Sequence, residues 1–190
     1  MTKSDFITAV YASIKRQQIK ELAEILLADN CLMESVFDVS LSSDGRRAFH
    51  CGLVFETLFI KDAALLDPVL DELCSKYNQI KHYSVARSYG KILANIYRLK
   101  EKKRATPAML RVTDGRYDTE IIDGCFKQLT AEKMRISVAG WQLQLLTYFM
   151  TDKHAWIKSE VLAIAERMSQ TGTPSVAAFI RKYSSKIAKL

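Results

Sequence analysis

Glycine and proline are scarce in this sequence: seven glycines and three prolines occur among 190 residues. Folds built from many short strands need frequent turns, and turns draw heavily on these two residue types. The scarcity therefore argues against an all-β fold and favours long helices. No stretch approaches the roughly 18 uninterrupted apolar residues of a membrane-spanning helix. The first residues lack the continuous apolar core of a signal peptide, so we expect a soluble, cytoplasmic protein with no membrane partner.

Motifs that carry chemistry are missing as well. The four cysteines form no C-x-x-C pair, and each is expected in an apolar helix face: Cys31, Cys51, Cys74 and Cys125. The histidines show no metal-ligand spacing, and no phosphate-binding loop or nucleophile elbow occurs. His50 precedes Cys51, but adjacent helical residues point about 100° apart and cooperate poorly. We therefore expect no catalytic residue, no cofactor and no metal, and favour a non-catalytic protein over an enzyme.

Apolar residues recur at helical spacing along nearly the whole chain. Three short helices are expected before residue 40, followed by longer ones over 46–60, 64–77, 82–100, 119–129, 132–149, 153–169 and 174–188. Pro68 fits the first turn of its helix, because the missing N–H would have no partner there. Asp62 is placed to cap the same helix. The expected fold is all-α, with about 8–10 helices.

An internal repeat aligns four segments on the alanines Ala48, Ala86, Ala139 and Ala177. The last three segments share the tripeptide Ser-Val-Ala, and the alanines are 38, 53 and 38 residues apart. Gly52 and Gly90 coincide in this register in mid-helix, where glycine costs about 1 kcal/mol relative to alanine. Their recurrence indicates that neighbouring helices approach closely. The longer middle interval is explained by an irregular basic insertion at about 100–116.

The repeat pattern resembles HEAT and armadillo-type repeats, in which stacked helix pairs bury one continuous core. The resemblance implies a right-handed α-solenoid of antiparallel helix pairs over residues 44–190, capped by helices in residues 1–43, within a single domain. A non-repetitive helical bundle is the alternative. The chain also faintly resembles short bacterial proteins labelled adenylosuccinate lyase. Because the serine-rich catalytic loop of that superfamily is absent, this second resemblance implies no lyase chemistry.

Positive charge is unevenly distributed along this chain of net charge +7. Residues 98–116 hold seven basic and two acidic side chains. The basic loop within this segment contains Lys100, Lys102, Lys103 and Arg104. Such a concentration of charge can attract an acidic protein or a phosphate backbone. The alternative is a solvated loop without a partner.

A polar stripe is expected on the helix over 82–100, where Arg87, Lys91, Asn95 and Arg98 share one face. The equivalent positions in later repeats are Gln144, Tyr148, Lys182 and Lys186. In HEAT-like stacks the second helix of each pair commonly lines the concave surface, so the resemblance implies a basic binding groove. The groove would turn apolar at Phe49, Leu53 and Thr57 in the first repeat. The alternative is the solvated side of ordinary amphipathic helices.

These features lead to two functional hypotheses. The first is a non-catalytic binding or scaffold module that holds an acidic protein segment, or nucleic acid, on the concave stripe. The second is a DNA glycosylase of the HEAT-like kind, for which the available groove residues would be Trp141, Tyr148, Trp156 and Asp152. An uncovered apolar end of the stack would also favour a homodimer.

Overall fold

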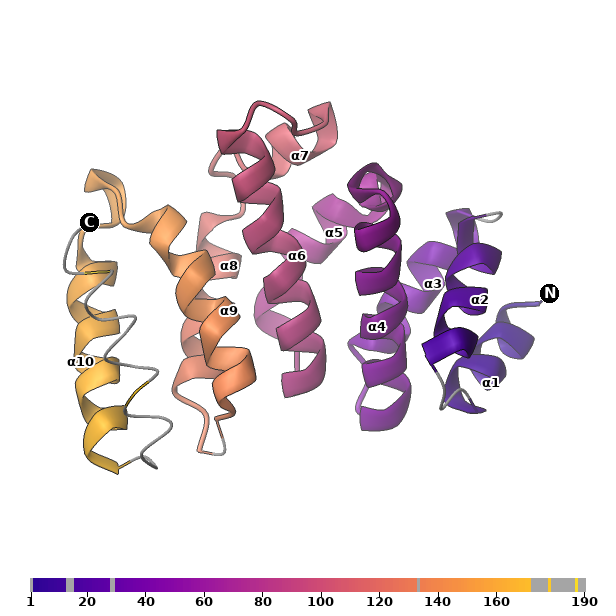
Figure 1. Cartoon of the computed structure of the whole chain (residues 1–190), viewed down its shortest axis with the longest axis horizontal. Coiled ribbons are helices and arrows are strands. Elements are labelled where there is room, and N and C mark those ends of the chain that lie inside the picture. Colours follow the sequence, from indigo (N-terminus) through magenta and orange to yellow (C-terminus); the bar gives the residue numbers. More distant parts are fainter. Residues whose placement is uncertain are drawn as a thin grey trace.

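The computed structural model of the chain describes residues 2–12, 16–27, 30–132 and 134–171, together with 178 and 187. Within these residues the structure contains helices and connecting turns without strands, which confirms the all-α class (Figure 1). The α-helices are α1 (Lys3–Ala12), α2 (Arg16–Leu27), α3 (Asn30–Ser40), α4 (Gly45–Lys61), α5 (Leu70–Ser75), α6 (Tyr83–Glu101), α7 (Pro107–Val112), α8 (Asp118–Leu129), α9 (Ile136–Leu146) and α10 (Trp156–Thr171). None of the described helices is long and apolar enough to cross a membrane.

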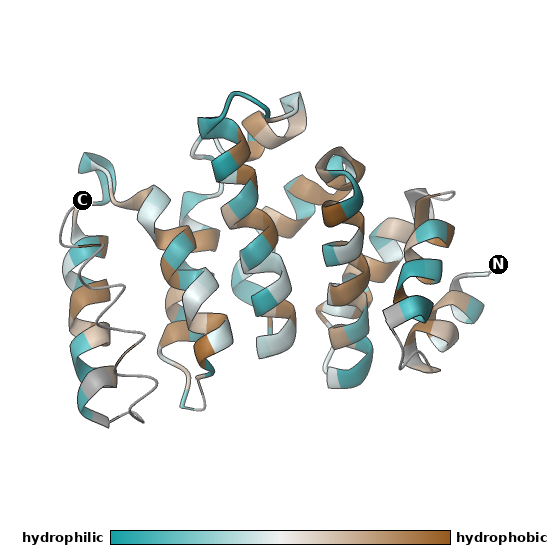
Figure 2. Ribbon diagram, viewed as in Figure 1, coloured by the Kyte–Doolittle hydropathy of each residue, from teal (hydrophilic) through white to brown (hydrophobic). Residues whose placement is uncertain are grey.

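The helices pack against one another in two layers. In the nearer layer of Figure 1, α4 lies between α2 and α6, and α6 contacts α9 on its other side. Behind this layer lie α3, α5 and α8, and the chain alternates between the two layers as it advances. Figure 2 shows hydrophobic and hydrophilic residues alternating along α4 and α6. One connected core of buried apolar residues joins the two layers.

Capping explains where α4 begins and where the next helix begins after it. The Asp44 carboxylate accepts hydrogen bonds from the backbone N–H groups of Arg46 and Arg47, both at 3.1 Å. Beyond the other end of α4, the Asp62 carboxylate accepts one from Ala64 N at 3.0 Å, as predicted. These bonds satisfy N–H groups that lack a partner in the first turn of a helix.

The single helix predicted over 64–77 is wrong. The chain instead forms a 3₁₀ helix over Ala63–Val69, then α5, then a second 3₁₀ helix over Tyr77–Gln79. Pro68 lies inside the first 3₁₀ helix rather than in the first turn of an α-helix. Its ring and missing N–H are incompatible with an α-helical bond to the preceding turn, so the α-helix begins only afterwards.

The predicted irregular segment over 100–116 is partly wrong, because it contains α7. Thr106 caps this helix by accepting a hydrogen bond from Met109 N at 3.2 Å, and Pro107 occupies its first turn. Before it, α6 ends with Lys103 in the left-handed region at φ 56°. Lys103 N bonds to Lys100 O and Arg104 N to Leu99 O, both at 2.9 Å, which is the Schellman pattern of helix termination.

Two further expectations concern helix bounds and glycines. The helix predicted over 132–149 is shorter as α9 and ends in a 3₁₀ turn, while the one predicted over 174–188 lies outside the described residues. The close helix approach predicted from glycine is found at Gly90, whereas a Cβ at Gly52 would make an ordinary contact. A Cβ on Gly52 would lie 3.5 Å from Cα of Val85 on α6, and one on Gly90 would lie 2.7 Å from Nε2 of Gln142 on α9.

Candidate binding surface

The predicted stripe on α6 meets a buried carboxylate from α4. Arg87 Nη2 lies 3.0 Å from Glu56 Oε2, and Lys91 Nζ lies 2.6 Å from Glu56 Oε1. Ser88 Oγ donates a third hydrogen bond to Glu56 Oε2 at 2.9 Å. The Glu56 side chain is only 10% exposed, whereas Arg87 and Lys91, called here the cation pair, are 29% and 28% exposed. Three donors therefore satisfy both oxygens of the Glu56 carboxylate.

The ionisation of Glu56 follows from these contacts. Burial on its own would raise the pKa of the Glu56 carboxyl, because it penalises the charged form. The hydrogen bonds from Lys91 and Ser88 and the charges of Arg87 and Lys91 outweigh burial and hold the pKa below its usual range. Glu56 is therefore a carboxylate near neutral pH, and together with the cation pair it leaves one net positive charge.

Glu56 was not identified from the sequence. A signal was present, because the repeat register that aligns Ala48 with Ala86 places Glu56 opposite the small apolar residue Ala94. A charged residue at a position that the next repeat fills with alanine predicts a buried polar contact. That register carries no information about the partner, which depends on how α4 and α6 pack.

Beside Glu56 and the cation pair, a groove of about 420 Å³ lies between the ends of α4 and α6. Its lining combines apolar residues, basic residues and one amide: Phe59, Ile60, Ala63, Lys91, Asn95, Arg98, Leu99, Lys102 and Arg104. No carboxylate belongs to this lining. Arg98, Lys102 and Arg104, called here the groove cations, form no ion pair with any residue that the structure describes. Asn95 holds its place by donating from Nδ2 to Lys91 O at 2.7 Å and accepting from Arg98 at 3.3 Å.

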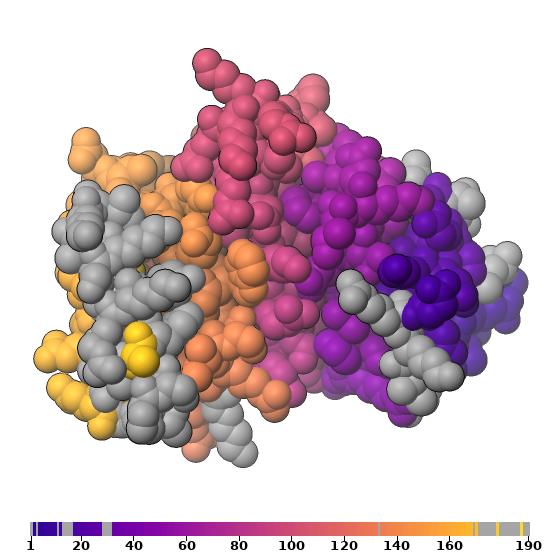
Figure 3. Space-filling view, viewed as in Figure 1, coloured from indigo at the N-terminus to yellow at the C-terminus, as the bar shows by residue number. Residues whose placement is uncertain are grey.

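A second groove, of about 400 Å³, lies on the other side of Ile60 between α2 and α4. It is lined by Ile19, Phe49, His50, Leu53, Glu56, Thr57 and Ile60. The structure thus places Phe49, Leu53 and Thr57 of the predicted apolar end in one groove. Ile60 is 65% exposed and borders both grooves, so it forms an apolar ridge between them. Figure 3 views this face, with α4 and α6 side by side near its centre.

Other predicted site residues lie elsewhere. Tyr148 stacks on Tyr97, with ring centroids 5.0 Å apart, and lines a separate hollow of about 440 Å³. Lys100 lines the same hollow, and its ammonium group donates to the carbonyl of Thr113. Gln144 is half-buried on α9. Lys103 does not line the groove between α4 and α6, and Lys182 and Lys186 lie outside the described residues.

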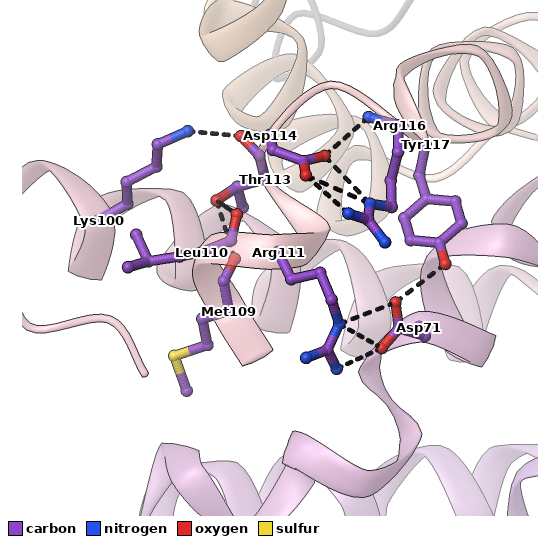
Figure 4. A network of polar contacts seen from close by, with 9 residues as sticks. All are labelled: Asp71, Lys100, Met109, Leu110, Arg111, Thr113, Asp114, Arg116 and Tyr117. Atoms are coloured by element: carbon purple, nitrogen blue, oxygen red, sulfur yellow. Dashed lines mark hydrogen bonds and ion pairs between the residues drawn. The ribbon is translucent and has the colours of Figure 1, made fainter. Parts of the chain in front are cut away.

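A polar network fixes the chain that follows the groove cations (Figure 4). Asp71 on α5 accepts hydrogen bonds from Arg111 Nη2 at 2.5 Å and from the Tyr117 hydroxyl at 2.9 Å. The bond from Arg111 is the main cause of the lowered pKa of Asp71. Asp114 and Arg116 form a further pair at 2.9 Å. These contacts attach α7 and the start of α8 to α5, so the basic loop is anchored at its far end.

Several residues considered for catalysis have other contacts or surroundings. Burial, followed by the charge of Asp44, raises the pKa of the Cys51 thiol to about 12, and the neighbouring His50 ring lies 2.7 Å from Val10 O. Trp156 stacks on Phe126, with centroids 5.5 Å apart. Asp152 is exposed and does not line the hollow beside Tyr148. Among the residues that the structure describes, no cluster of three histidine, cysteine or acidic side chains could hold a metal.

Comparisons with models of protein families, with curated proteins and with solved structures find no significant match to this chain.

Proposed function

We propose that the chain is a non-catalytic binding module that holds an acidic segment of another protein on the face formed by α4 and α6. The observation that carries this proposal is the groove between these helices. Its lining combines apolar side chains with the groove cations and contains no acid. Apolar pockets with a few convergent polar groups are typical of binding sites, and a cationic rim favours acidic partners.

The architecture supports the proposal in a second way. We propose that the two layers form a HEAT-like solenoid of stacked helix pairs, in which α2, α4, α6 and α9 line one face. The side-by-side packing of α4, α6 and α9 and the alternation between layers agree with this arrangement. The repeat spacing of 38 residues agrees with it too. Solenoids of this kind use their extended faces to bind other proteins.

The chemistry of the face defines the expected partner. Ile60 and the two grooves beside it require an apolar side chain that can be buried, because exposed apolar surface favours contact with another apolar surface. The groove cations require carboxylates within reach of the same segment. An amphipathic helix with apolar residues on one side and acidic residues near one end meets both requirements, as in other helix-in-groove complexes.

The proposal can be tested with a fluorescent synthetic peptide that has leucines along one helical face and glutamates elsewhere. We expect fluorescence anisotropy to show binding that weakens in Ile60→Ser and in Arg104→Glu. The matched control is Lys103→Glu, which reverses a neighbouring charge that does not line the groove. A peptide of the same composition with scrambled leucines should bind less well. No binding, or binding insensitive to Ile60→Ser and Arg104→Glu, would overturn the proposal.

The same assay with duplex DNA addresses the nucleic-acid alternative. Binding to DNA by wild-type protein that falls steeply with salt and is lost in Arg104→Glu would assign the face to nucleic acid instead. In that case a test for release of methylated bases would follow, because the glycosylase hypothesis requires DNA binding first.

A further inference from the structure

The cation pair is already occupied by a carboxylate of the protein itself. Glu56 is held between Arg87 and Lys91 at 3.0 Å and 2.6 Å, and the contact joins α4 to α6. The groove cations begin about two helical turns beyond Lys91 and have no such partner among the described residues. The basic residues of this face therefore form two parts: the cation pair is bonded to Glu56, and the groove cations have no acidic partner among the described residues.

We propose that Glu56 sets the selectivity of this face, because it occupies both members of the cation pair, cancels one of their two charges and directs the acidic part of a bound segment to the groove cations. The inference rests on the proposed function and adds an orientation to it. The apolar part of the segment lies over Ile60 and the groove between α2 and α4, and the acidic part lies at the end of α6. Glu56 acts through Arg87 and Lys91, so it is a positioning residue.

Desolvation gives the physical reason that an external carboxylate does not displace Glu56. The Glu56 side chain is 10% exposed and accepts from three donors, so breaking these contacts would leave a buried charge without partners. Such a loss costs several kcal/mol. A ligand carboxylate at the surface gains less than this from an exposed ion pair. Displacement is unfavourable, and ligand acids bind where the cations are unoccupied.

Selectivity against nucleic acid follows from the same contact. Affinity for DNA rises steeply with the number of phosphates that a protein neutralises, and each contact adds about 0.9 to the salt dependence. With one charge of the cation pair cancelled and both cations bonded to Glu56, most of the free positive charge of the face lies in the short cluster of groove cations instead of in a continuous row along α6. A short acidic segment can be bound by the groove cations alone, whereas the affinity for a phosphate backbone increases most with a continuous row of basic residues along α6.

The test compares Glu56→Gln with Glu24→Gln. Both changes raise the net charge by one, and Gln keeps the shape of the side chain. Glu24 pairs with Lys61 at 2.6 Å, but its side chain is 60% exposed and it does not contact the cation pair. For Glu56→Gln we expect duplex DNA binding to increase about three- to tenfold at low salt, with a steeper salt dependence. For Glu24→Gln we expect less than half of that increase.

A triple variant, Glu56→Gln/Arg87→Gln/Lys91→Gln, identifies the source of the gain. It should bind DNA no better than wild type, because the released cations are gone. In the peptide assay, Glu56→Gln should reduce the loss caused by Arg104→Glu, since the freed cation pair offers an alternative site for the acidic residues. Circular dichroism and thermal melting establish that each variant is folded.

The outcomes separate the inference from the proposed function. If Glu56→Gln and Glu24→Gln gain equally, or if the triple variant retains the gain, Glu56 does not set selectivity, although the peptide can still bind through Ile60. If wild-type protein does not bind the peptide while Glu56→Gln gains DNA binding through the cation pair, the proposed function is wrong and the charge-masking role of Glu56 stands.

Discussion

The hydroxyl of Tyr77 donates a 2.8 Å hydrogen bond to Oε1 of Gln142, which lies 65 positions along the chain. Both side chains are buried, and the other end of the amide donates from Nε2 to Ala86 O at 2.9 Å. One side chain of α9 is thereby bonded to α6 and to the 3₁₀ helix after α5. Because buried polar groups lose much stability when left unpaired, this bridge is a sensitive point of the fold.

Gln142→Leu should lower the free energy of unfolding by about 2–4 kcal/mol, because it leaves the Tyr77 hydroxyl buried without an acceptor. Urea denaturation followed by circular dichroism measures the loss. Gln144→Leu on the same helix is the control, since Gln144 is half-buried and its replacement should cost less than about 1 kcal/mol. Equal losses in the two variants would show that the bridge contributes nothing specific.

Two helical glycines should respond oppositely to alanine. A Cβ on Gly124 would lie 2.5 Å from Cδ1 of Tyr77 and 3.0 Å from the Tyr77 carbonyl oxygen, so Gly124→Ala should destabilise by about 1–3 kcal/mol through overpacking. A Cβ on Gly52 would meet Val85 Cα at 3.5 Å, an ordinary contact. Gly52→Ala should leave stability unchanged or raise it by up to about 1 kcal/mol. Thermal melting of both variants decides, and a stable Gly124→Ala would contradict the packing.

Acid should remove the stabilisation that Glu56 provides. Its pKa in the folded protein lies below the usual range, despite the opposing effect of burial, because Lys91, Ser88 and Arg87 favour the charged form. The contribution is therefore complete above the unfolded pKa of about 4.3 and is lost as pH falls through the lower folded value. The stability difference between wild type and Glu56→Gln should shrink as pH is lowered from about 6 to 3. A difference independent of pH would mean that the charge is not responsible.

The backbone conformation of Lys103 should lower the stability of the folded protein. Its φ of 56° lies in the left-handed region, which costs an L-residue other than glycine about 1 kcal/mol or more. Lys103→Gly should therefore stabilise the protein by about 0.5–1 kcal/mol. Lys102→Gly is the matched comparison, since Lys102 has a φ of −82° and gains nothing from glycine. Denaturation midpoints that do not separate the two variants would contradict the conformation given to Lys103.

Local signals in the sequence predicted the elements that depend on them. Asp62 was predicted to cap the helix after α4, and it caps the 3₁₀ helix Ala63–Val69, because capping involves residues only two or three positions away. The prediction of one helix over 64–77 failed because the same local pattern fits two structures. One is an α-helix with Pro68 in its first turn, and the other is a 3₁₀ helix that contains Pro68. The spacing of the α6 stripe placed Arg87, Lys91, Asn95 and Arg98 together; in the structure the first two contact Glu56 and the last three line one groove.

The sequence did not predict which basic side chains pair with acidic residues far away in the chain. Nothing local distinguishes Lys91, which pairs with Glu56 from 35 positions away, from Arg98, which has no acidic partner in the described chain. Lys100 and Arg104 looked equivalent in the basic loop, yet Lys100 bonds to Thr113 and lines a different hollow. The difference arises because α7 folds back and is fixed through Arg111 to Asp71. Composition and charge along the sequence do not predict this arrangement.

The position of α6 between α4 and α9 has a thermodynamic consequence for the whole chain. The two halves touch through this helix and, in the other layer, through the contacts of α5 and the 3₁₀ helix Tyr77–Gln79 with α7 and α8. Their cooperativity depends on both sets of contacts. A segment that binds across α4 and α6 binds only the folded protein, because the two helices are not held side by side in the unfolded chain. By mass action such a ligand adds its binding free energy to the resistance against unfolding, so occupancy would be visible as a rise in melting temperature that grows with ligand concentration.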